Sequence, residues 1–196
     1  MLISAVYYRY QEMHISPETL LIPLLSALWI MMPAYVPNPV AAFLGGGRPI
    51  DGGRTYRDGR RIFGDGKTWR GFIAGVVSGV VIGGLMILAQ QALGITWLPK
   101  LTFPVVFLLA FGALAGDLVK SFFKRRLGKE QGAEWLIADQ YDLVIGPLVL
   151  LLIFEYAWVM TYLTPLVIFW IIVITPILHR AVNIIGYITG IKDVPW

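Results

Sequence analysis

The sequence predicts an all-α, polytopic integral membrane protein, a bundle of about five membrane-spanning helices. Of its 196 residues, 57% are hydrophobic and only 14% are charged. The mean hydropathy is +0.71, which is typical of a membrane protein and not of a soluble domain. Apolar runs of about 20 residues recur along the chain, and a helix of that length crosses the hydrocarbon core of a bilayer.

Five spans are expected, at about 18–43, 71–94, 99–117, 143–163 and 165–190. Pro33, Pro37 and Pro39 fall in the first span, so its last third is expected to be broken or re-entrant. Pro104 and Pro176 predict kinks in the third and fifth spans. Glu155 is expected near the middle of the fourth span, where a carboxylate indicates either a function or a hydrogen bond within the bundle.

Two charged loops, at about 44–70 and 117–142, hold most of the cations, whereas the opposite side offers only Arg9 and Lys100. The positive-inside rule therefore predicts a multi-pass protein of the cell membrane with both loops and the C-terminus in the cytoplasm and the N-terminus outside. Because the positive charge flanks membrane spans, no nucleic-acid partner is expected. The chain has no cysteine, which excludes disulfides and thiolate metal sites. No cleavable signal peptide is expected.

The second loop carries the stronger chemical signal. Asp117, Lys120, Ser121 and Lys124 share one face if the segment is helical, and Asp139 and Asp142, three residues apart, share another. Ionisable groups beside hydrocarbon are costly unless they pair or line a wet cavity. The acids could hold a divalent cation and the lysines phosphate groups. The alternative is that the acids only neutralise the neighbouring lysines.

The first loop, GGGRPIDGGRTYRDGRRIFGDGKTWRG, combines glycines, which allow a close approach of the backbone to a ligand, with arginines that bind phosphate. Its Gly66-Lys67-Thr68 is not a P-loop. That motif requires a glycine five residues before Gly66, where Arg61 stands, and no strand precedes it. Some of the arginines could serve only as topological determinants or as contacts to anionic lipid head groups.

Two elements together resemble the CDP-diacylglycerol synthase family of CTP-dependent membrane cytidylyltransferases. The first loop ends in Lys67-Thr68 followed by Gly71, which resembles the family's K-T-x-x-G element. The second loop resembles the family signature in the residues Ser121, Lys124, Arg125, Lys129-Glu130, Gly132 and Asp139-Gln140-Tyr141-Asp142. A His-Gly-Gly run is missing and Gln140 stands where the family has arginine. Both departures, with the short chain, resemble the archaeal branch, the CDP-archaeol synthases.

The resemblance implies a polar cavity, covered by the two loops and open sideways to lipid, in which a lipid phosphate attacks CTP. The expected partners are CTP, a prenylated glycerol phosphate lipid and membrane lipids, and the expected cofactor is Mg²⁺. The resemblance assigns catalysis to Asp117, Lys120, Lys124 and Asp142, and metal binding to Asp117, Asp139 and Asp142. Nucleotide or phosphate binding falls to Lys67, Thr68, Arg70, Ser121, Arg125 and Lys129.

Other readings of the sequence stay open. A prenol or phytol kinase is also a small membrane enzyme with a nucleotide substrate, and a small transporter or a lipid-binding scaffold is the non-enzymatic alternative. His179 and Asn183, with Arg180 beside them, either close the cavity from the fifth span or serve packing. Asn38 is similarly ambiguous. The sequence carries no signal for an oligomeric state.

Overall fold

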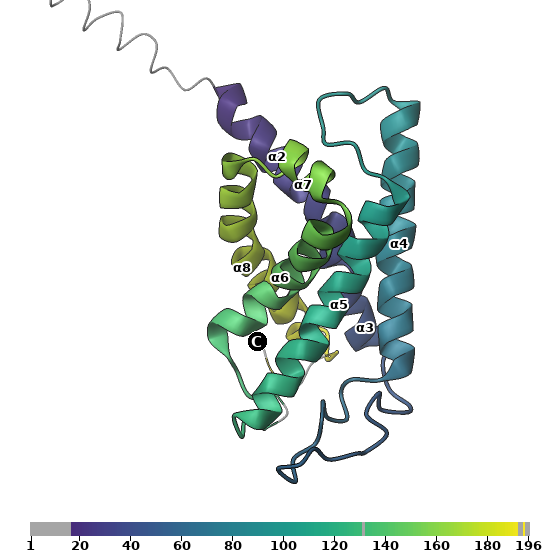
Figure 1. Ribbon diagram of the computed structural model, residues 1–196, viewed down its shortest axis with the longest axis vertical. Coiled ribbons are helices and arrows are strands. Elements are labelled where there is room, and N and C mark those ends of the chain that lie inside the picture. Colours follow the sequence, from purple (N-terminus) through teal and green to yellow (C-terminus); the bar gives the residue numbers. More distant parts are fainter. Residues whose placement is uncertain (1–16, 131, 192–193, 195–196) are drawn as a thin grey trace, which may run out of the picture.

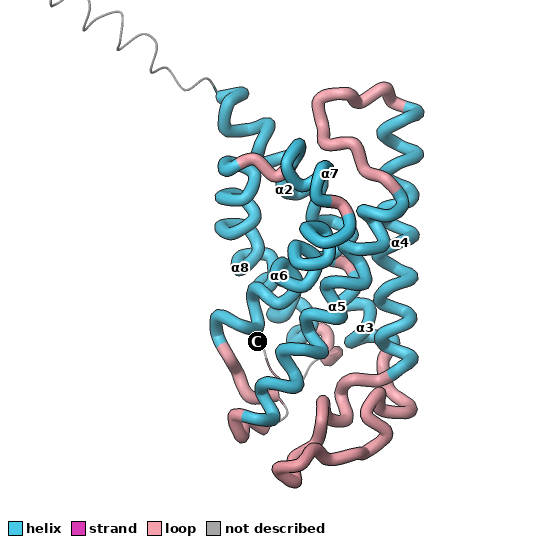
Figure 2. The backbone as a smooth tube through the Cα atoms, in the orientation of Figure 1, coloured by secondary structure: helices cyan, strands magenta, loops and turns pink. Residues whose placement is uncertain are grey.

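The computed structural model describes residues 17–130, 132–191 and 194, and within these residues the chain forms helices joined by loops, without a strand (Figures 1 and 2). The helices are α2 (Pro17–Tyr35), α3 (Pro37–Leu44), α4 (Trp69–Ala92), α5 (Phe103–Arg126), α6 (Leu136–Phe154), α7 (Tyr156–Tyr162) and α8 (Pro165–Ile188). Five helical segments are long and apolar enough to cross a membrane, with α2 and α3 counted as one, which confirms the predicted number. The predicted outer N-terminus, with Arg9, lies outside the described residues.

The prolines act in three different ways. The expected break in the first span amounts to a single residue, because α2 ends at Tyr35, α3 begins at Pro37 and Val36 between them keeps helical backbone angles. Pro104 produces no kink within the third span, because it occupies the first turn of α5, where a missing N–H is not needed. Pro176 lies inside α8, and the kink expected there stays a prediction.

Two boundaries differ from the expected ones. Helix α5 continues through the charged residues to Arg126 and α6 begins at Leu136, so the predicted 117–142 loop shrinks to 127–135. A helix satisfies the hydrogen bonds of its own backbone whether its side chains are apolar or charged. Because the charged side chains here pair with one another, the ends of the apolar runs did not coincide with the ends of the helices. Helix α6 stops at Phe154, and Glu155 lies at its junction with α7 and not at mid-span.

Helix α5 is the centre of the bundle and contacts α2, α3, α4 and α6. Its residues Val105, Leu109 and Ala113 are almost fully buried. Glycines bring its neighbours close, because a Cβ on Gly83 of α4 would lie 2.2 Å from a Val106 methyl, and a Cβ on Gly146 of α6 would lie 2.1 Å from the Gly112 carbonyl oxygen. The backbones of α5 and α6 therefore run in direct contact.

Both charged loops, 45–68 and 127–135, lie at one end of the bundle, below α4 and α5 in Figure 2. The 93–102 loop and α7 lie at the other end, where Trp158 Nε1 donates a 2.7 Å hydrogen bond to the Lys100 carbonyl oxygen. The ionisable side chains of the two loops and of the adjoining helix ends thus meet on one side of the molecule.

Candidate functional site

The close contact between α5 and α6 faces the acids of one helix toward the lysines of the other. A Cβ on Gly116 would lie 2.3 Å from the carbonyl oxygen of Asp142, so only glycine allows this approach. Asp117 and Asp142 are both buried. Their burial beside a membrane span requires that opposite charges compensate them.

Lys120 supplies that compensation from the centre of the cluster. Its Nζ lies 2.6 Å from Asp142 Oδ2, 3.0 Å from Asp117 Oδ1 and 3.1 Å from Asp139 Oδ1. One ammonium group therefore contacts three carboxylates that come from two helices. The predicted sharing of a helix face by Asp117 and Lys120 is confirmed as an ion pair.

Lys124 and Asp139 form the outer part of the cluster. Lys124 Nζ lies 2.9 Å from both Asp139 carboxylate oxygens and donates a 2.6 Å hydrogen bond to the Ala133 carbonyl oxygen. Asp139 Oδ2 also accepts a 2.7 Å hydrogen bond from the Trp135 N–H, just before the first turn of α6. This pair therefore fixes the 127–135 loop against the site.

Lys67 joins the cluster from the first loop, where its Nζ donates to Asp117 Oδ2 in an ion pair. The two residues are 50 positions apart, so only the folded chain brings the two predicted elements together. The cluster holds Lys67, Lys120, Lys124, Asp117, Asp139 and Asp142. Its three lysines and three aspartates balance in formal charge.

The remaining predicted phosphate-binding residues make other contacts in this structure. Thr68 is the N-cap of α4, its Oγ1 accepting from the Gly71 N–H at 3.2 Å, and Arg70 Nε donates to the Leu44 carbonyl oxygen at 2.6 Å. Arg125 donates to the carbonyl oxygens of Phe63 and Lys129, and Lys129 Nζ donates to the Glu134 carbonyl oxygen. Ser121 is buried on α5, one turn beyond Asp117.

A residue that sequence reasoning missed, Asp51, organises the first loop. Its buried carboxylate accepts 3.0 Å hydrogen bonds from the N–H groups of Gly53, Phe63 and Gly64, and it pairs with Arg61 Nη2 at 2.7 Å. Burial alone would raise the pKa of Asp51, but Arg61 and the three N–H groups outweigh it and hold that pKa well below its usual range. The Asp51-Gly52-Gly53 turn sequence was the available signal.

The first loop also grips the end of α5. Arg60 Nη1 donates to the carbonyl oxygens of Arg125, at 3.2 Å, and Arg126, at 2.7 Å, both at the C-terminus of α5. In return Arg126 Nη2 donates to the carbonyl oxygens of Arg60 and Arg61. These reciprocal contacts hold the loop that carries Lys67 against the helix that carries Asp117.

Helix α8 reaches the edge of the cluster. His179, Arg180 and Asn183 line a small pocket together with Asp139 and Gln140 of α6. Arg180 Nη1 lies 3.5 Å from Glu134 Oε1 of the 127–135 loop. These α8 residues therefore lie beside Asp139, at the edge of the cluster, and both readings of them stay open.

The donor set of the cluster suits Mg²⁺, which prefers carboxylate oxygens. Asp142 Oδ2 is buried and, apart from its ion pair with Lys120, accepts no hydrogen bond from the residues that the structure describes. Lys120 Nζ occupies the position where the three carboxylates meet. In the present arrangement, no three acidic or histidine side chains of the described residues are placed to bind one metal ion. A divalent cation would compete with Lys120 for these oxygens.

Comparison with known proteins gives consistent results. Residues 20–196 match the family described as CarS-like, CDP-archaeol synthase. The chain is 62% identical to the CDP-archaeol synthase of Methanosphaerula palustris and 60% identical to that of Methanoculleus marisnigri, with 85% of this chain and all of each relative covered. A solved structure described as an intramembrane enzyme for archaeal membrane lipids biosynthesis is 33% identical, with a TM-score of 0.62, covering 86% of this chain and 95% of that one.

Proposed function

The chain belongs to the CarS-like CDP-archaeol synthase family, and we propose that its substrates are CTP and an unsaturated archaetidic acid, 2,3-bis-O-geranylgeranyl-sn-glycerol 1-phosphate. It is a membrane-embedded nucleotidyltransferase that forms CDP-archaeol by cytidylyl transfer in lipid biosynthesis. The observation that carries the substrate proposal is the cluster of three lysines and three aspartates where α5 and α6 meet at the charged end of the bundle. Such a site serves a reaction between a water-soluble nucleotide and a lipid phosphate.

In the proposed reaction an oxygen of the lipid phosphate attacks the α-phosphorus of CTP. A new phosphorus–oxygen bond forms, the bond from the α-phosphorus to the bridging oxygen of the β-phosphate breaks, and pyrophosphate leaves with that electron pair. A phosphate monoester is largely dianionic near neutral pH, so the attacking oxygen has little need of a general base. Catalysis then consists of in-line positioning and of neutralising charge.

Lysines of the cluster would provide the neutralisation. Lys120 and Lys124 would turn from their carboxylates toward the phosphates, and Lys67 would bring the first loop down on the nucleotide. Arg125, whose guanidinium contacts only carbonyl oxygens among the described hydrogen bonds, would add positive charge beside them. Because the three lysines and three aspartates of the cluster cancel in formal charge, binding two anionic substrates requires such further cations.

Mg²⁺ would be held by Asp117, Asp139 and Asp142, and it would supply charge neutralisation on the triphosphate. The carboxylates would then exchange Lys120 for the metal ion. Freed from them, the Lys120 ammonium group would face the phosphates.

The proposed orientation has both charged loops and the C-terminus in the cytoplasm and the N-terminus outside, in the cell membrane. Nucleotides would then reach the cluster from the compartment that contains them. The lipid would approach sideways from the bilayer. The excess of arginine and lysine at the charged end of the bundle supports this orientation.

The experiment that tests the function measures pyrophosphate release by the purified chain in detergent with CTP and Mg²⁺. Parallel reactions contain the geranylgeranyl lipid phosphate, a diacyl phosphatidic acid or no lipid, and mass spectrometry identifies the product. We expect release only with a lipid phosphate, preferentially the prenylated one, and none after EDTA. A kinase would instead form a phosphorylated lipid and a nucleoside diphosphate, and a folded protein that turns over neither lipid would contradict the proposal.

In the same assay Lys120→Met removes the central cation and should lower kcat by at least about 100-fold, the usual effect of losing one charge-stabilising group. Lys100→Met is the matched control, because Lys100 is exposed at the opposite end of the bundle and offers only its backbone to Trp158. Equal turnover by the two variants, with equal thermal stability, would remove Lys120 from the proposed mechanism.

A further inference from the structure

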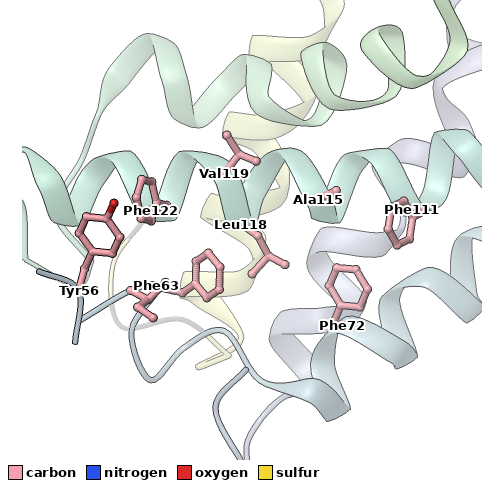
Figure 3. A pocket seen from close by; sticks show the side chains of 9 residues that line it. Tyr56, Phe63, Phe72, Phe111, Ala115, Leu118, Val119 and Phe122 are labelled. Atoms are coloured by element: carbon pink, nitrogen blue, oxygen red, sulfur yellow. The ribbon is translucent and has the colours of Figure 1, made fainter. Parts of the chain in front are cut away.

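An apolar groove of about 530 Å³ lies beneath the first loop, in the valley between α4 and α5 (Figure 3). The loop contributes Tyr56, Ile62 and Phe63, and α4 contributes Phe72. The rest of the lining comes from α5, including Leu118 and Phe122, and it is likewise apolar. The volume lies within the range of ligand-binding sites in proteins.

The groove is separate from the charged cluster. Its α5 residues Phe111, Ala115, Leu118 and Phe122 recur every three or four positions and form one stripe of the helix. Asp117 and Lys120 belong to another stripe, roughly half a turn away around the helix axis. The body of α5 therefore stands between the groove and the site of the proposed reaction.

The surroundings of the groove indicate what fills it. Both of the membrane-spanning helices that form the groove carry exposed apolar side chains, with Ile73 of α4, next to the groove residue Phe72 in the sequence, 57% exposed and the groove residue Val119 of α5 56% exposed. Side chains of this kind on a membrane span face hydrocarbon. A cavity without polar lining does not hold water, so a lipid chain is the matching occupant.

The part of the first loop that covers the groove carries positive charge. Arg57 follows the groove residue Tyr56 in the loop, and Arg54 precedes it by two positions. Both are exposed, and neither forms an ion pair with any residue that the structure describes. An anionic head group gains about 1 kcal/mol for each arginine near the membrane surface.

We propose that this groove binds one hydrocarbon chain of an anionic bilayer phospholipid, distinct from the reacting lipid, and that the bound lipid holds the first loop in place. Tyr56, on the groove side of the loop, is 44% exposed, and a bound hydrocarbon chain would cover more of it. The same loop carries Lys67 to Asp117. The binding claim stands by itself, whereas its consequence for turnover rests on the proposed function.

Native mass spectrometry in mild detergent tests the binding with two lipid probes, phosphatidylglycerol and phosphatidylcholine of identical chains. Both are phosphodiesters without a terminal phosphate group and cannot react with CTP, so the result is independent of the catalytic assay. Ala115→Trp fills the groove, and Val119→Trp, at its exposed edge, is a second variant that the fold tolerates easily. Val81→Trp is the control, because Val81 is 54% exposed on α4 and is not part of the groove.

We expect the wild-type chain and Val81→Trp to retain one phosphatidylglycerol, and at least one groove variant to retain it about tenfold less. Arg57→Gln should reduce the preference over phosphatidylcholine, and added phosphatidylglycerol should slow hydrogen exchange in residues 51–64 of the wild type and of Val81→Trp, but not of a groove variant that has lost the lipid. Equal retention by wild type and both groove variants, or no preference for the anionic probe, would overturn the proposal. So would a groove variant that raises KM for the lipid phosphate while it retains phosphatidylglycerol, because the groove would then hold the reacting lipid.

Discussion

Asp51 shows how one carboxylate can order a whole loop. Its two oxygens accept three backbone N–H groups and the Arg61 guanidinium, so residues 51–64 close into a compact unit. The side chain of Asp51 is fully buried, and a buried carboxylate that loses its charge leaves its donors unsatisfied. Because Lys67 lies near the end of the same loop, this network acts on the cluster without touching it.

Asp51→Asn should destabilise the first loop by about 3 kcal/mol, because an amide cannot replace the charge and turns a donor toward other donors. The pKa of Asp51 is depressed in the folded chain, so its contribution to stability is fully present above the unfolded pKa of about 4 and is lost as the pH falls below that value. Hydrogen exchange in residues 51–64, corrected for intrinsic rates, should show constant protection from pH 7 to about 4 and a decline below.

The Asn variant should show weak protection in the loop at every pH. Asp65→Asn is the control, because Asp65 is exposed and contacts only the outer side of Arg61. If protection in the wild-type loop declined between pH 7 and 5, another group and not Asp51 would control it.

Single residues also mark how far the sequence could be followed. The pairing of Asp117 with Lys120 could be predicted, because a helix places positions three apart on one face. The contact of Lys67 with Asp117 could not, since it depends on how the first loop folds over α5. Thr68 was expected to bind phosphate because it follows Lys67 in the sequence. In the structure its hydroxyl oxygen caps the N-terminus of α4.

At the scale of elements, glycines set the distance between α4 and its neighbours. Gly71, Gly75, Gly79 and Gly83 are buried along one face of α4, with the backbone and side chains of α3 and α5 in direct contact. In a membrane, close packing of this kind replaces the hydrophobic driving force that associates helices in water. The stripe therefore holds the helix that follows the first loop against the helix of the cluster.

Gly83→Ala should lower the stability of the bundle by about 1–3 kcal/mol, because the new Cβ would lie 2.2 Å from a methyl of Val106, a stiff β-branched side chain. The better helix propensity of alanine offsets at most about 1 kcal/mol of this. Thermal unfolding in detergent, followed by tryptophan fluorescence, measures the change.

The neighbouring Gly84→Ala is a matched control, because no described atom beyond its own helix turn lies within 4 Å of its added Cβ. It should leave the melting temperature unchanged or raise it slightly through helix propensity alone. Equal melting temperatures for the two variants would show that α4 is not packed on α5 through this face.

Element boundaries were the weakest part of the sequence-based prediction. The number of spans follows from apolar length, and the break near Pro37 follows from the missing N–H groups. Hydropathy placed the end of the third span at residue 117, yet α5 continues to Arg126 because its charged side chains pair with α6 and with the first loop. That pairing is tertiary and leaves no mark in a hydropathy profile.

For the whole molecule, the distribution of charge predicts one orientation of the chain in the membrane. The two loops interlock through Arg60 and Arg126 at one end of the bundle, and they join there with the lysines of the cluster. The opposite end carries the 93–102 loop, in which Lys100 is the single cation. Moving one elementary charge across the membrane potential takes about 2.3 kcal/mol per 100 mV, so this asymmetry favours one orientation strongly.

Cysteine labelling measures the orientation directly, because the natural chain contains no cysteine and each single substitution reports one position. Arg57→Cys and Glu130→Cys place thiols on the two charged loops, and Leu93→Cys places one at the opposite end, at a side chain that is 72% exposed. In intact cells a membrane-impermeant maleimide should label position 93 and not positions 57 and 130, and lysis should expose all three. Labelling of position 57 or 130 before lysis would contradict the predicted orientation. The cluster, in which Lys67 meets Asp117, would then face away from the cytoplasmic nucleotide pool, and the source of CTP in the proposed reaction would have to be reconsidered.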